Sequence, residues 1–534
     1  MPSFFKKKSQ KGKKTAEKQK KPAVSSPLSE VLEENLAVIT SKTGNSTDII
    51  IRRLKHSPRF KTESAIVYLK GLTDTQTVQE ILIESLMKSD PVEQEPSSMQ
   101  EMVEGYLPLG IMESLKDWET LFQALMSGHT IIFVDGFSEA MSTSTEGGEQ
   151  RSIEEPSTQR AIRGSREGFT ESIETNISMV RRIIQNPTLW TETMTIGRVT
   201  KTKVTIMYIK GIARDDIIEE LRNRLKKIDI DSVLESGYIE QYIEDQSLTV
   251  FPTLYHSERP DVVAGNLLEG RFALFVNGSP FVLLGPVVFI QFFQSIEDYT
   301  ERFYISTALR LLRVLIFFIS LIGPATYIAA TTFHQEMIPT QLLVAIAAQR
   351  ESVPFPSFVE AIIMEVTFEI LREAGIRMPK AIGSAISIVG ALVIGQAAVQ
   401  AGVVSAAMVI IVAITAIASF ATPSFGIAIS TRLLRFLFMI SAATFGFYGM
   451  ILGFIILVVH LCGLRSFGVP YMSPLAPFVP ADINDTVIRG PLWADRKRPS
   501  FMSGQNQLRQ GEETGRPEPD KSRQMVTKNE GDAQ

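Results

Sequence analysis

The chain has 534 residues, of which 45% are hydrophobic and 21% charged, and its formal net charge at pH 7 is -4. This length exceeds one ordinary domain, and the apolar residues are concentrated in the C-terminal half, which predicts a soluble half followed by a membrane half. The one cysteine, Cys462, excludes an intrachain disulfide, and the sequence lacks the ligand spacing of a zinc site.

Residues 1–27 form a basic arm, with nine lysines between Lys6 and Lys21 and a single acid, Glu17. Such a run is typical of a solvated, disordered tail rather than of a nucleic-acid binder, and a contact with anionic lipid is the alternative. No apolar segment follows the arm. A cleaved signal peptide is therefore not expected, and the N-terminal region is predicted to be cytoplasmic.

Residues 28–163 are predicted to form two short helices, a first α/β lobe and a mobile loop. The helical pattern that opens this region ends at Gly44, and Asp135-Gly136 is typical of a tight hairpin turn. The expected elements are helices over 28–40 and 47–55, a strand over 64–69, helices over 75–88 and 117–127, and a strand over 129–134. The loop over 141–164 is polar and should be exposed.

The same order of elements recurs in residues 164–298, which are predicted to hold a linking helix and a second α/β lobe. Gly211 and Tyr208 match Gly71 and Tyr68 at an offset of 140, and three later matches share an offset of 142: Gly270 with Gly128, Phe275 with Phe133, and Asn277-Gly278 with Asp135-Gly136. Two offsets that nearly agree predict a tandem pair of related lobes. Chance similarity between generic strands is the alternative. The elements expected here are helices over 168–186 and 215–228 and a strand over 204–210.

Neither lobe offers a constellation with catalytic chemistry. The sequence has no phosphate loop, no nucleophile elbow and no close cluster of metal ligands, and His56, His129 and His256 stand alone. Isolated histidines are more often ordinary surface or core residues. The lobes are therefore predicted to be a binding or interaction module, and no enzyme activity, cofactor or metal is expected.

Residues 299–463 are predicted to form an α-helical, multi-pass membrane domain. The stretch Val314–Phe333 has twenty residues without a charge, enough to cross a hydrocarbon core of about 30 Å. Residues 381–431 hold fifty-one uncharged positions and divide near residues 400–402 into two spans, and residues 436–459 supply the last span. Gly449 and Gly453 have the small-residue spacing that favours close helix packing.

Between these runs, residues 357–380 place four glutamates in one amphipathic helix. At 100° per residue several of its charges share a stripe, and the predicted pore-lining or gating residues are Glu365, Val366, Glu369, Arg372 and Glu373. An ionisable group at the bilayer centre costs about 2.5 to 3.5 kcal/mol, so these groups should face water, counter-charges or a bundle interior. A pore-lining helix in an oligomer is one interpretation, and a helix lying flat on the membrane surface is the other.

Lysine and arginine residues near the span ends set the orientation. If the acidic helix crosses, the basic groups at 302–313, 372–380 and 432–435 all fall on the cytoplasmic side. The count is then five crossings, which leaves residues 464–534 outside, although Arg496, Lys497 and Arg498 in this tail are basic. The side of the tail therefore stays open, and its proline-rich, polar composition predicts disorder.

Four stretches of the sequence resemble the A subunit of bacterial spore germinant receptors, the GerA-type family. They are REGFTESIETN at 166–176, MTIGRVTKTKV at 194–204, PFPSFVEAIIMEVTFEILREAGIRMPK at 354–380 and HLCGLRSFGVPYMSPLAP at 460–477, and the resemblance covers residues 60–480. It implies a multi-pass protein of the spore inner membrane that assembles with a permease-like B subunit and a lipoprotein C subunit. It also implies self-association, as pentamers, into a ligand-gated cation channel that triggers germination.

Three other functions remain open at this point. One is a sporulation paralogue of the A subunit that acts with the dipicolinic-acid channel, and another is a membrane scaffold that does not conduct. A secondary transporter would show broken helices in inverted repeats, and the predicted spans show no such symmetry. The acidic helix is compatible with a channel, because a ring of carboxylates attracts cations. No nucleic-acid partner is expected.

Overall fold

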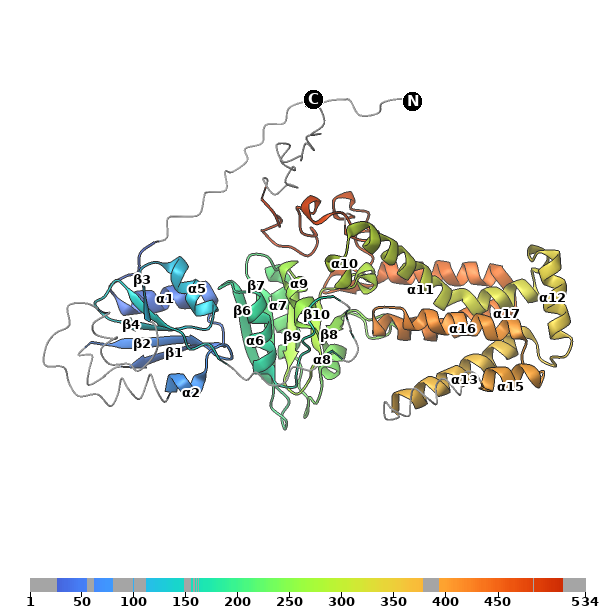
Figure 1. Ribbon diagram of the computed structural model, residues 1–534, viewed down its shortest axis with the longest axis horizontal. Helices are drawn as coiled ribbons and strands as arrows, with labels where there is room; N and C mark the ends of the chain where they lie inside the picture. The colour runs from blue at the N-terminus through green and yellow to red at the C-terminus, as the bar shows by residue number, and fades with distance from the viewer. Residues whose placement is uncertain are drawn as a thin grey trace, which may run out of the picture. The chain divides into compact units, whose positions relative to one another are not determined.

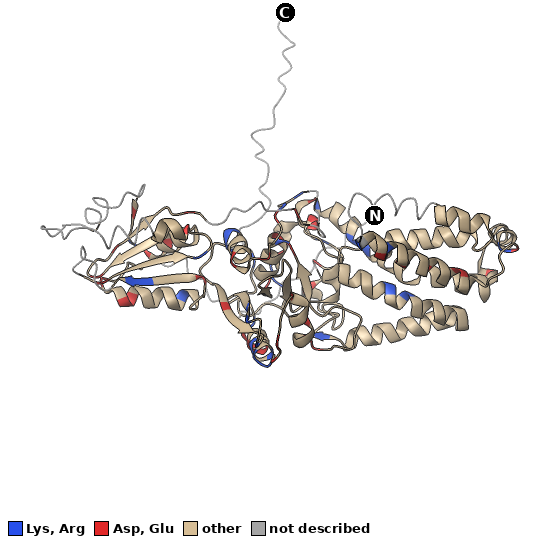
Figure 2. Ribbon diagram, turned by 90° about the horizontal axis from the view of Figure 1, so that it is seen from below, with Lys and Arg blue, Asp and Glu red and all other residues tan. Residues whose placement is uncertain are grey.

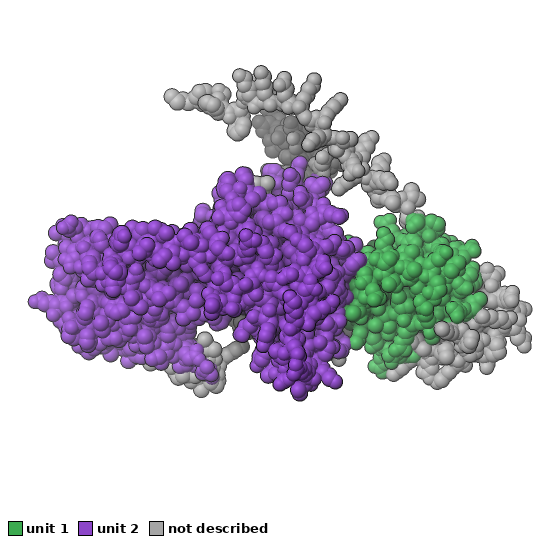
Figure 3. All heavy atoms as spheres, turned by 180° about the vertical axis from the view of Figure 1, so that it is seen from behind, with its two compact units in different colours: residues 1–148, 185–187 green, residues 149–184, 188–534 purple. Residues whose placement is uncertain are grey.

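The protein is described here as a computed structural model (Figure 1), which covers residues 26–54, 62–79, 99, 112–147, 155–156, 159, 161, 163–377, 393–483 and 485–511. The chain divides into two compact units, residues 1–148 with 185–187 and residues 149–184 with 188–534 (Figure 3). Several predicted features lie wholly or partly outside the described residues: the basic arm, most of the helix over 75–88, much of the loop over 141–164, residues 381–392 of the membrane run and residues 512–534 of the tail. The start of the loop predicted over 141–164 is wrong, because Ala140–Thr143 form a buried strand.

The first unit contains a five-stranded antiparallel sheet in the order β1-β2-β4-β5-β3. Its described elements are α1 (Leu32–Thr43), β1 (Ile49–Leu54), β2 (Ser64–Leu69), α2 (Thr75–Thr77), β3 (Met112–Leu115), α5 (Trp118–Met126), β4 (Thr130–Val134) and β5 (Ala140–Thr143). Strand β2 is buried throughout, with Ala65 and Val67 in one apolar cluster and Ile66 and Tyr68 in another. This alternation is that of a central strand covered on both faces.

The helix predicted over 47–55 is wrong, because residues Ile49–Leu54 form strand β1. Three consecutive isoleucines open this segment, and β-branched side chains favour strands. The strand pairs antiparallel with β2, from Ile49 opposite Leu69 to Leu54 opposite Ser64. The helix predicted just before it is confirmed as α1, and Gly44 closes that helix in a left-handed conformation with φ 65°.

The second lobe opens the second unit, and its sheet order β6-β7-β9-β10-β8 repeats that of the first sheet strand for strand. Its elements are α6 (Ile173–Ile183), β6 (Leu189–Ile196), β7 (Thr202–Ile209), α7 (Asp215–Lys226), α8 (Ser236–Ile243), β8 (Tyr255–Ser257), α9 (Pro260–Leu268), β9 (Phe272–Val276), β10 (Val282–Gly285), η2 (Phe289–Phe293) and α10 (Glu297–Thr300). The prediction of two related α/β lobes is confirmed.

The likeness extends to the turns that start helices α1 and α6. The backbone N–H of Ser29 donates to Asn35 Oδ1 at 2.9 Å, and that of Thr170 donates to Asn176 Oδ1 at 2.8 Å. Each asparagine donates its own Nδ2 back to the carbonyl of the same residue, at 2.7 and 2.6 Å. The two asparagines lie 141 positions apart, so the repeat includes the helix before each sheet as well as the sheet itself.

Within the described residues, the helical bundle that follows the second lobe consists of α11 (Phe303–Thr332), η3 (Gln335–Met337), α12 (Thr340–Arg350), α13 (Ser357–Arg377), α15 (Gly395–Gln400), α16 (Ala406–Phe420) and α17 (Phe425–Gly463). By length and composition, α11 and α17 could cross a membrane, and α16 is a shorter apolar helix. Figure 2 shows how few charged residues these helices carry compared with the lobes. The predicted division at residues 400–402 is confirmed, because α15 ends at Gln400 and Gly402 adopts a positive φ of 65°.

The single span predicted over 436–459 is wrong, because α17 turns back on itself at Gly446, where the backbone is not helical (φ 60°, ψ -143°). A Cβ on Gly453 would lie 3.3 Å from the ring of Phe438, which precedes it by fifteen residues. One straight helix would separate these residues by about 22 Å. The predicted close packing at Gly449 and Gly453 is confirmed, and the partner is the first half of the same helix.

The tail after α17 contains the short elements β11 (Arg465–Ser466), β12 (Val469–Pro470), η5 (Pro480–Asp482) and η6 (Leu492–Ala494), and it lies against the second lobe. The Ser466 hydroxyl donates to the Thr253 carbonyl at 2.7 Å, and the Gly504 N–H donates to the Ile212 carbonyl at 2.7 Å. The fold-back at Gly446 therefore returns the chain to the end of the bundle where the second lobe lies.

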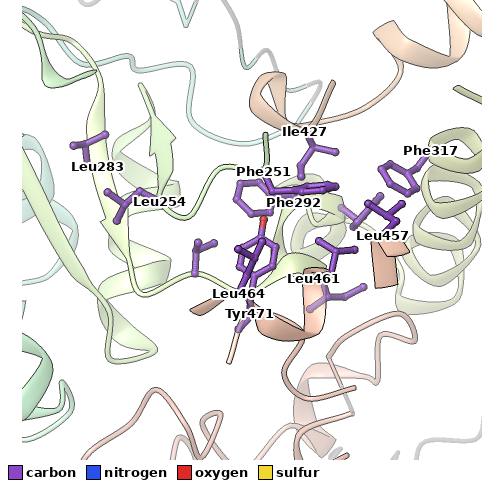
Figure 4. Close-up of a cluster of buried hydrophobic side chains, with 14 of the residues drawn as sticks. Phe251, Leu254, Leu283, Phe292, Phe317, Ile427, Leu457, Leu461, Leu464 and Tyr471 are labelled. Atoms are coloured by element: carbon purple, nitrogen blue, oxygen red, sulfur yellow. The ribbon is translucent and has the colours of Figure 1, made fainter. Parts of the chain in front are cut away.

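One hydrophobic core joins the second lobe, the helices and the tail (Figure 4). Phe251 and Phe292 of the lobe, Phe317 of α11, Leu461 of α17 and Tyr471 of the tail all belong to it. The Tyr471 hydroxyl also donates to the Pro252 carbonyl at 2.8 Å. Because this core is continuous, a movement of the second lobe should displace the ends of α11 and α17 that pack against it.

Candidate functional site

The acidic helix predicted over residues 357–380 is confirmed as α13, and its first turn is fixed by a buried carboxylate. Glu360 Oε2 accepts a hydrogen bond from the Ser405 N–H at 2.8 Å, and Glu360 Oε1 lies 3.4 Å from Arg350 Nε. Further along, Arg372 Nη2 donates to Ser419 Oγ at 2.8 Å. Because these two contacts have the same order in α13 and α16, the two helices run in the same direction.

The middle of α13 is tied to α17 by a fully buried ion pair. Arg435 Nη1 lies 2.6 Å from Glu365 Oε2, and both side chains are 1% exposed. The same guanidinium donates to α11 through its Nε, 2.7 Å from the Ser320 carbonyl, and through its Nη2, 3.0 Å from Ser320 Oγ. Arg435 thus joins three helices, and its charge is matched by Glu365.

A second group of ion pairs follows one turn along α13. Glu369 Oε2 accepts from Arg432 Nη1 at 3.0 Å, and Glu369 Oε1 accepts from Arg372 Nη1 at 3.2 Å. The Arg372 guanidinium also lies over the rings of Phe368 and Phe420, at 5.0 and 4.8 Å from their centroids. Cation–π contacts of this kind stabilise an arginine that is partly removed from water.

The structure divides the predicted site into two faces. Glu365, Glu369 and Arg372 face the bundle and are brought together there with arginines of α17. Val366, which is 44% exposed, and Glu373 lie on the other face of α13. The Glu373 carboxylate pairs with Arg377 at 2.7 Å, and both side chains are exposed.

The sequence reasoning missed the arginine partners of the acidic helix. In the sequence, Arg432 and Arg435 indicate only the orientation of the spans, and no sequence signal marks Ser320 and Ser419 as acceptors. A usable signal was nevertheless present, because Arg432 and Arg435 lie three positions apart in an apolar helix and so share one face with no acid nearby in sequence. Charges in that setting call for partners on another helix.

A further buried charge network lies where α11 meets the tail. Arg310 Nε lies 2.8 Å from Asp298 Oδ2, and Arg310 Nη1 lies 2.9 Å from Asp485 Oδ1. Asp298 also pairs with Arg313, at 2.8 Å. Burial raises the pKa of the Asp485 carboxyl, although Arg310 and the hydroxyl of Tyr299 oppose this by stabilising the carboxylate. The network fixes the start of α11 to both the second lobe and the tail.

These features define a class of protein: two tandem α/β lobes joined to a bundle of apolar helices in which arginines of a helical hairpin neutralise an acidic helix. The family model described as Bacillus/Clostridium GerA spore germination protein matches residues 37–501. The chain belongs to this family, within which it is of the germinant-receptor A-subunit type.

The chain is also similar to individual proteins. The chain is 60% identical to spore germination protein KA of Bacillus subtilis (strain 168), over 95% of this chain and 93% of that protein. It is 39% identical to spore germination protein GerLA of Bacillus cereus, over 89% and 95%. A crystal structure of the N-terminal domain of the A subunit of the Bacillus megaterium spore germinant receptor GerK3 is 47% identical, with a TM-score of 0.40, and covers 50% of this chain and 100% of that chain.

Proposed function

We propose that this chain is the A subunit of a nutrient germinant receptor in the spore inner membrane and that copies of it surround a ligand-gated cation channel that triggers germination. Family membership supports the receptor. The division of α13 into two faces supports the channel. The carboxylates of the inner face are neutralised by arginines of the same chain, whereas the outer face is exposed and could face an axis shared between copies.

In this proposal the outer face of α13 lines the pore. Val366 and Ile370 are exposed neighbours one turn apart, and an apolar ring at their level would close a narrow pore by excluding water. Glu373 lies on the same face and would add a ring of carboxylates that favours cations over anions. Glu365, Glu369 and Arg372 act on the pore by setting the rotation of the helix.

Among the described helices, the proposed membrane crossings are α11, α13, α16 and the two halves of α17. In the proposed topology the tail lies on the same side of the membrane as the second lobe, because the two are in contact. Arginines at the start of α11 and at the end of α13 support a cytoplasmic placement of that side.

The proposed partners are other copies of this chain, in a pentamer, together with a permease-like B subunit and a lipoprotein C subunit. The nutrient is expected to bind the B subunit. The buried core between the second lobe and the bundle supplies a route by which an event in the complex reaches α11 and α17.

The test is cation release from vesicles or spores that carry the assembled complex. Val366→Ala should leak without nutrient because it widens the apolar ring, and Glu373→Gln should lower cation flux after triggering. Val344→Ala is the matched control, since it changes another exposed valine, on α12. Normal release and triggering in both test variants, at normal amounts of complex, would reject the pore and leave α13 as a helix that only packs in a scaffold.

A further inference from the structure

We propose that residues 488–497 of the tail bind the headgroup region of the bilayer on the side of the second lobe, with apolar side chains in the interface and basic side chains on anionic lipid phosphates. The proposal rests on the membrane placement given above. It assigns a lipid-binding role to a tail whose composition predicts only disorder.

The chemistry of the segment suits an interface. Ile488, Leu492 and Trp493 are 61%, 54% and 50% exposed, although the second unit offers a large apolar core close by. Arg496 and Lys497 follow directly and are also exposed. Tryptophan is enriched at membrane–water boundaries, and each basic residue near an anionic surface contributes about 1 kcal/mol of attraction.

Hydrogen bonds to later residues of the tail and to the second lobe hold this segment in place. Asp495 Oδ2 accepts from Arg509 Nη1 at 2.7 Å, and the Leu492 carbonyl accepts from Gln510 Nε2 at 2.7 Å. Arg498, just beyond the segment, donates through its Nε to the Leu268 carbonyl of the lobe at 2.7 Å. The exposed apolar side chains are therefore displayed by a fixed loop, which avoids much of the entropy cost of ordering it on a surface.

The position of the segment along α11 points to the bilayer surface. The Arg489 N–H donates to Thr307 Oγ1 at 3.1 Å, so the residue after Ile488 lies beside the second turn of α11. At this level α11 begins to expose apolar side chains, among them Tyr304 and Leu311. Its nearby charge Arg310 is buried against Asp298 and Asp485. The tail segment thus lies beside the part of a proposed crossing helix that exposes apolar side chains.

A direct test uses tryptophan fluorescence, because the chain has only three tryptophans, Trp118, Trp190 and Trp493. The full-length chain with Trp118→Phe and Trp190→Phe is reconstituted into vesicles of phosphatidylglycerol and phosphatidylcholine. Brominated lipids, labelled either near the headgroup or near the chain end, then report the depth of Trp493. We expect emission to be lost with both labels, and more with the shallow one. Emission unaffected by either label would overturn the proposal.

Two further variants separate this inference from the membrane placement itself. A tryptophan introduced as Phe454→Trp, on the second half of α17, in a chain without Trp493 should be quenched more by the deep label. If it is quenched and Trp493 is not, the tail proposal fails alone, and if neither is quenched, the membrane placement fails too. Replacing Arg496 and Lys497 together with glutamine should weaken the shallow quenching in vesicles rich in phosphatidylglycerol. Unchanged quenching there would refute the role of the basic pair.

Discussion

Removal of Arg435 tests the ion pair that joins α13 to α17. In Arg435→Met the side chain keeps its length but loses its charge, so the Glu365 carboxylate stays buried beside it without a partner. Breaking a buried pair in this way costs about 3 to 5 kcal/mol. For a domain of 150 to 250 residues, each kcal/mol moves the melting temperature by about 2 to 4 °C, so the expected drop is roughly 6 to 20 °C.

The assay is thermal unfolding of the purified full-length chain, followed by the fraction that remains monodisperse after heating. Arg377→Met is the matched control, because it makes the same change in the exposed pair with Glu373. Exposed pairs of this kind contribute about 0 to 1 kcal/mol, so the melting temperature of the control should be close to that of the unaltered chain.

The double variant Arg435→Met with Glu365→Gln completes the test. With the charge of Glu365 removed as well, no unpaired carboxylate remains, and most of the lost stability should return. If Arg435→Met has the same melting temperature as Arg377→Met, the buried pair does not stabilise the packing of α13. If the double variant is as unstable as the single one, the loss comes from packing around Arg435 instead of from its charge.

Other consequences of the structure can be measured separately. Gly446→Ala should destabilise the bundle by about 1 to 3 kcal/mol, because the turn needs a positive φ that alanine rarely adopts, and an unchanged melting temperature would contradict the fold-back. Burial, with Glu244 and Glu235 nearby, raises the pKa of Glu240 to about 7 from 4.5, so the folded state holds this proton more tightly than the unfolded chain. Stability from Glu240 is therefore present below pH 4.5 and lost as pH rises to about 7, and Glu240→Gln should flatten that part of the unfolding profile. Single cysteines at residues 375 and 401 of a cysteine-free chain should be labelled from opposite sides of the membrane, whereas one at residue 500 should share the side of residue 375.

Local patterns in the sequence were sufficient for most of the two lobes. Strand β2 and helices α5 and α7 lie where apolar periodicity predicted them, because each packs one regular face or is buried on both. The same rules failed for β1, whose half-buried, charged sequence IIIRRL resembles a short helix until it is paired with β2. The pairing and register of a strand depend on partner strands that are distant in sequence, so they cannot be predicted from the segment alone.

The hairpin in α17 could not be predicted from hydropathy. An apolar run of this length has the same composition whether it crosses once or folds back, and Gly446 is one of several glycines there. The positive φ at Gly446 and the packing of Gly453 against Phe438 distinguish a hairpin from a single span, and both depend on tertiary packing. Without this turn the tail would leave the bundle at the end away from the second lobe, whereas with it the tail returns to the lobe.

The sequence predicts which charges lie on the acidic helix, but it leaves their environment open between water, counter-charges and a bundle interior. Periodicity places Glu365 and Glu369 on one stripe, and a stripe of acids beside apolar runs is compatible both with a wet pore and with neutralised packing. The choice between them depends on Arg432 and Arg435, which approach only after α17 packs across α11 and α13. The same contacts turn Val366 outward. A pore built from this chain would therefore owe its selectivity to Glu373 and its closure to apolar side chains, while the buried pairs keep the helix from rotating.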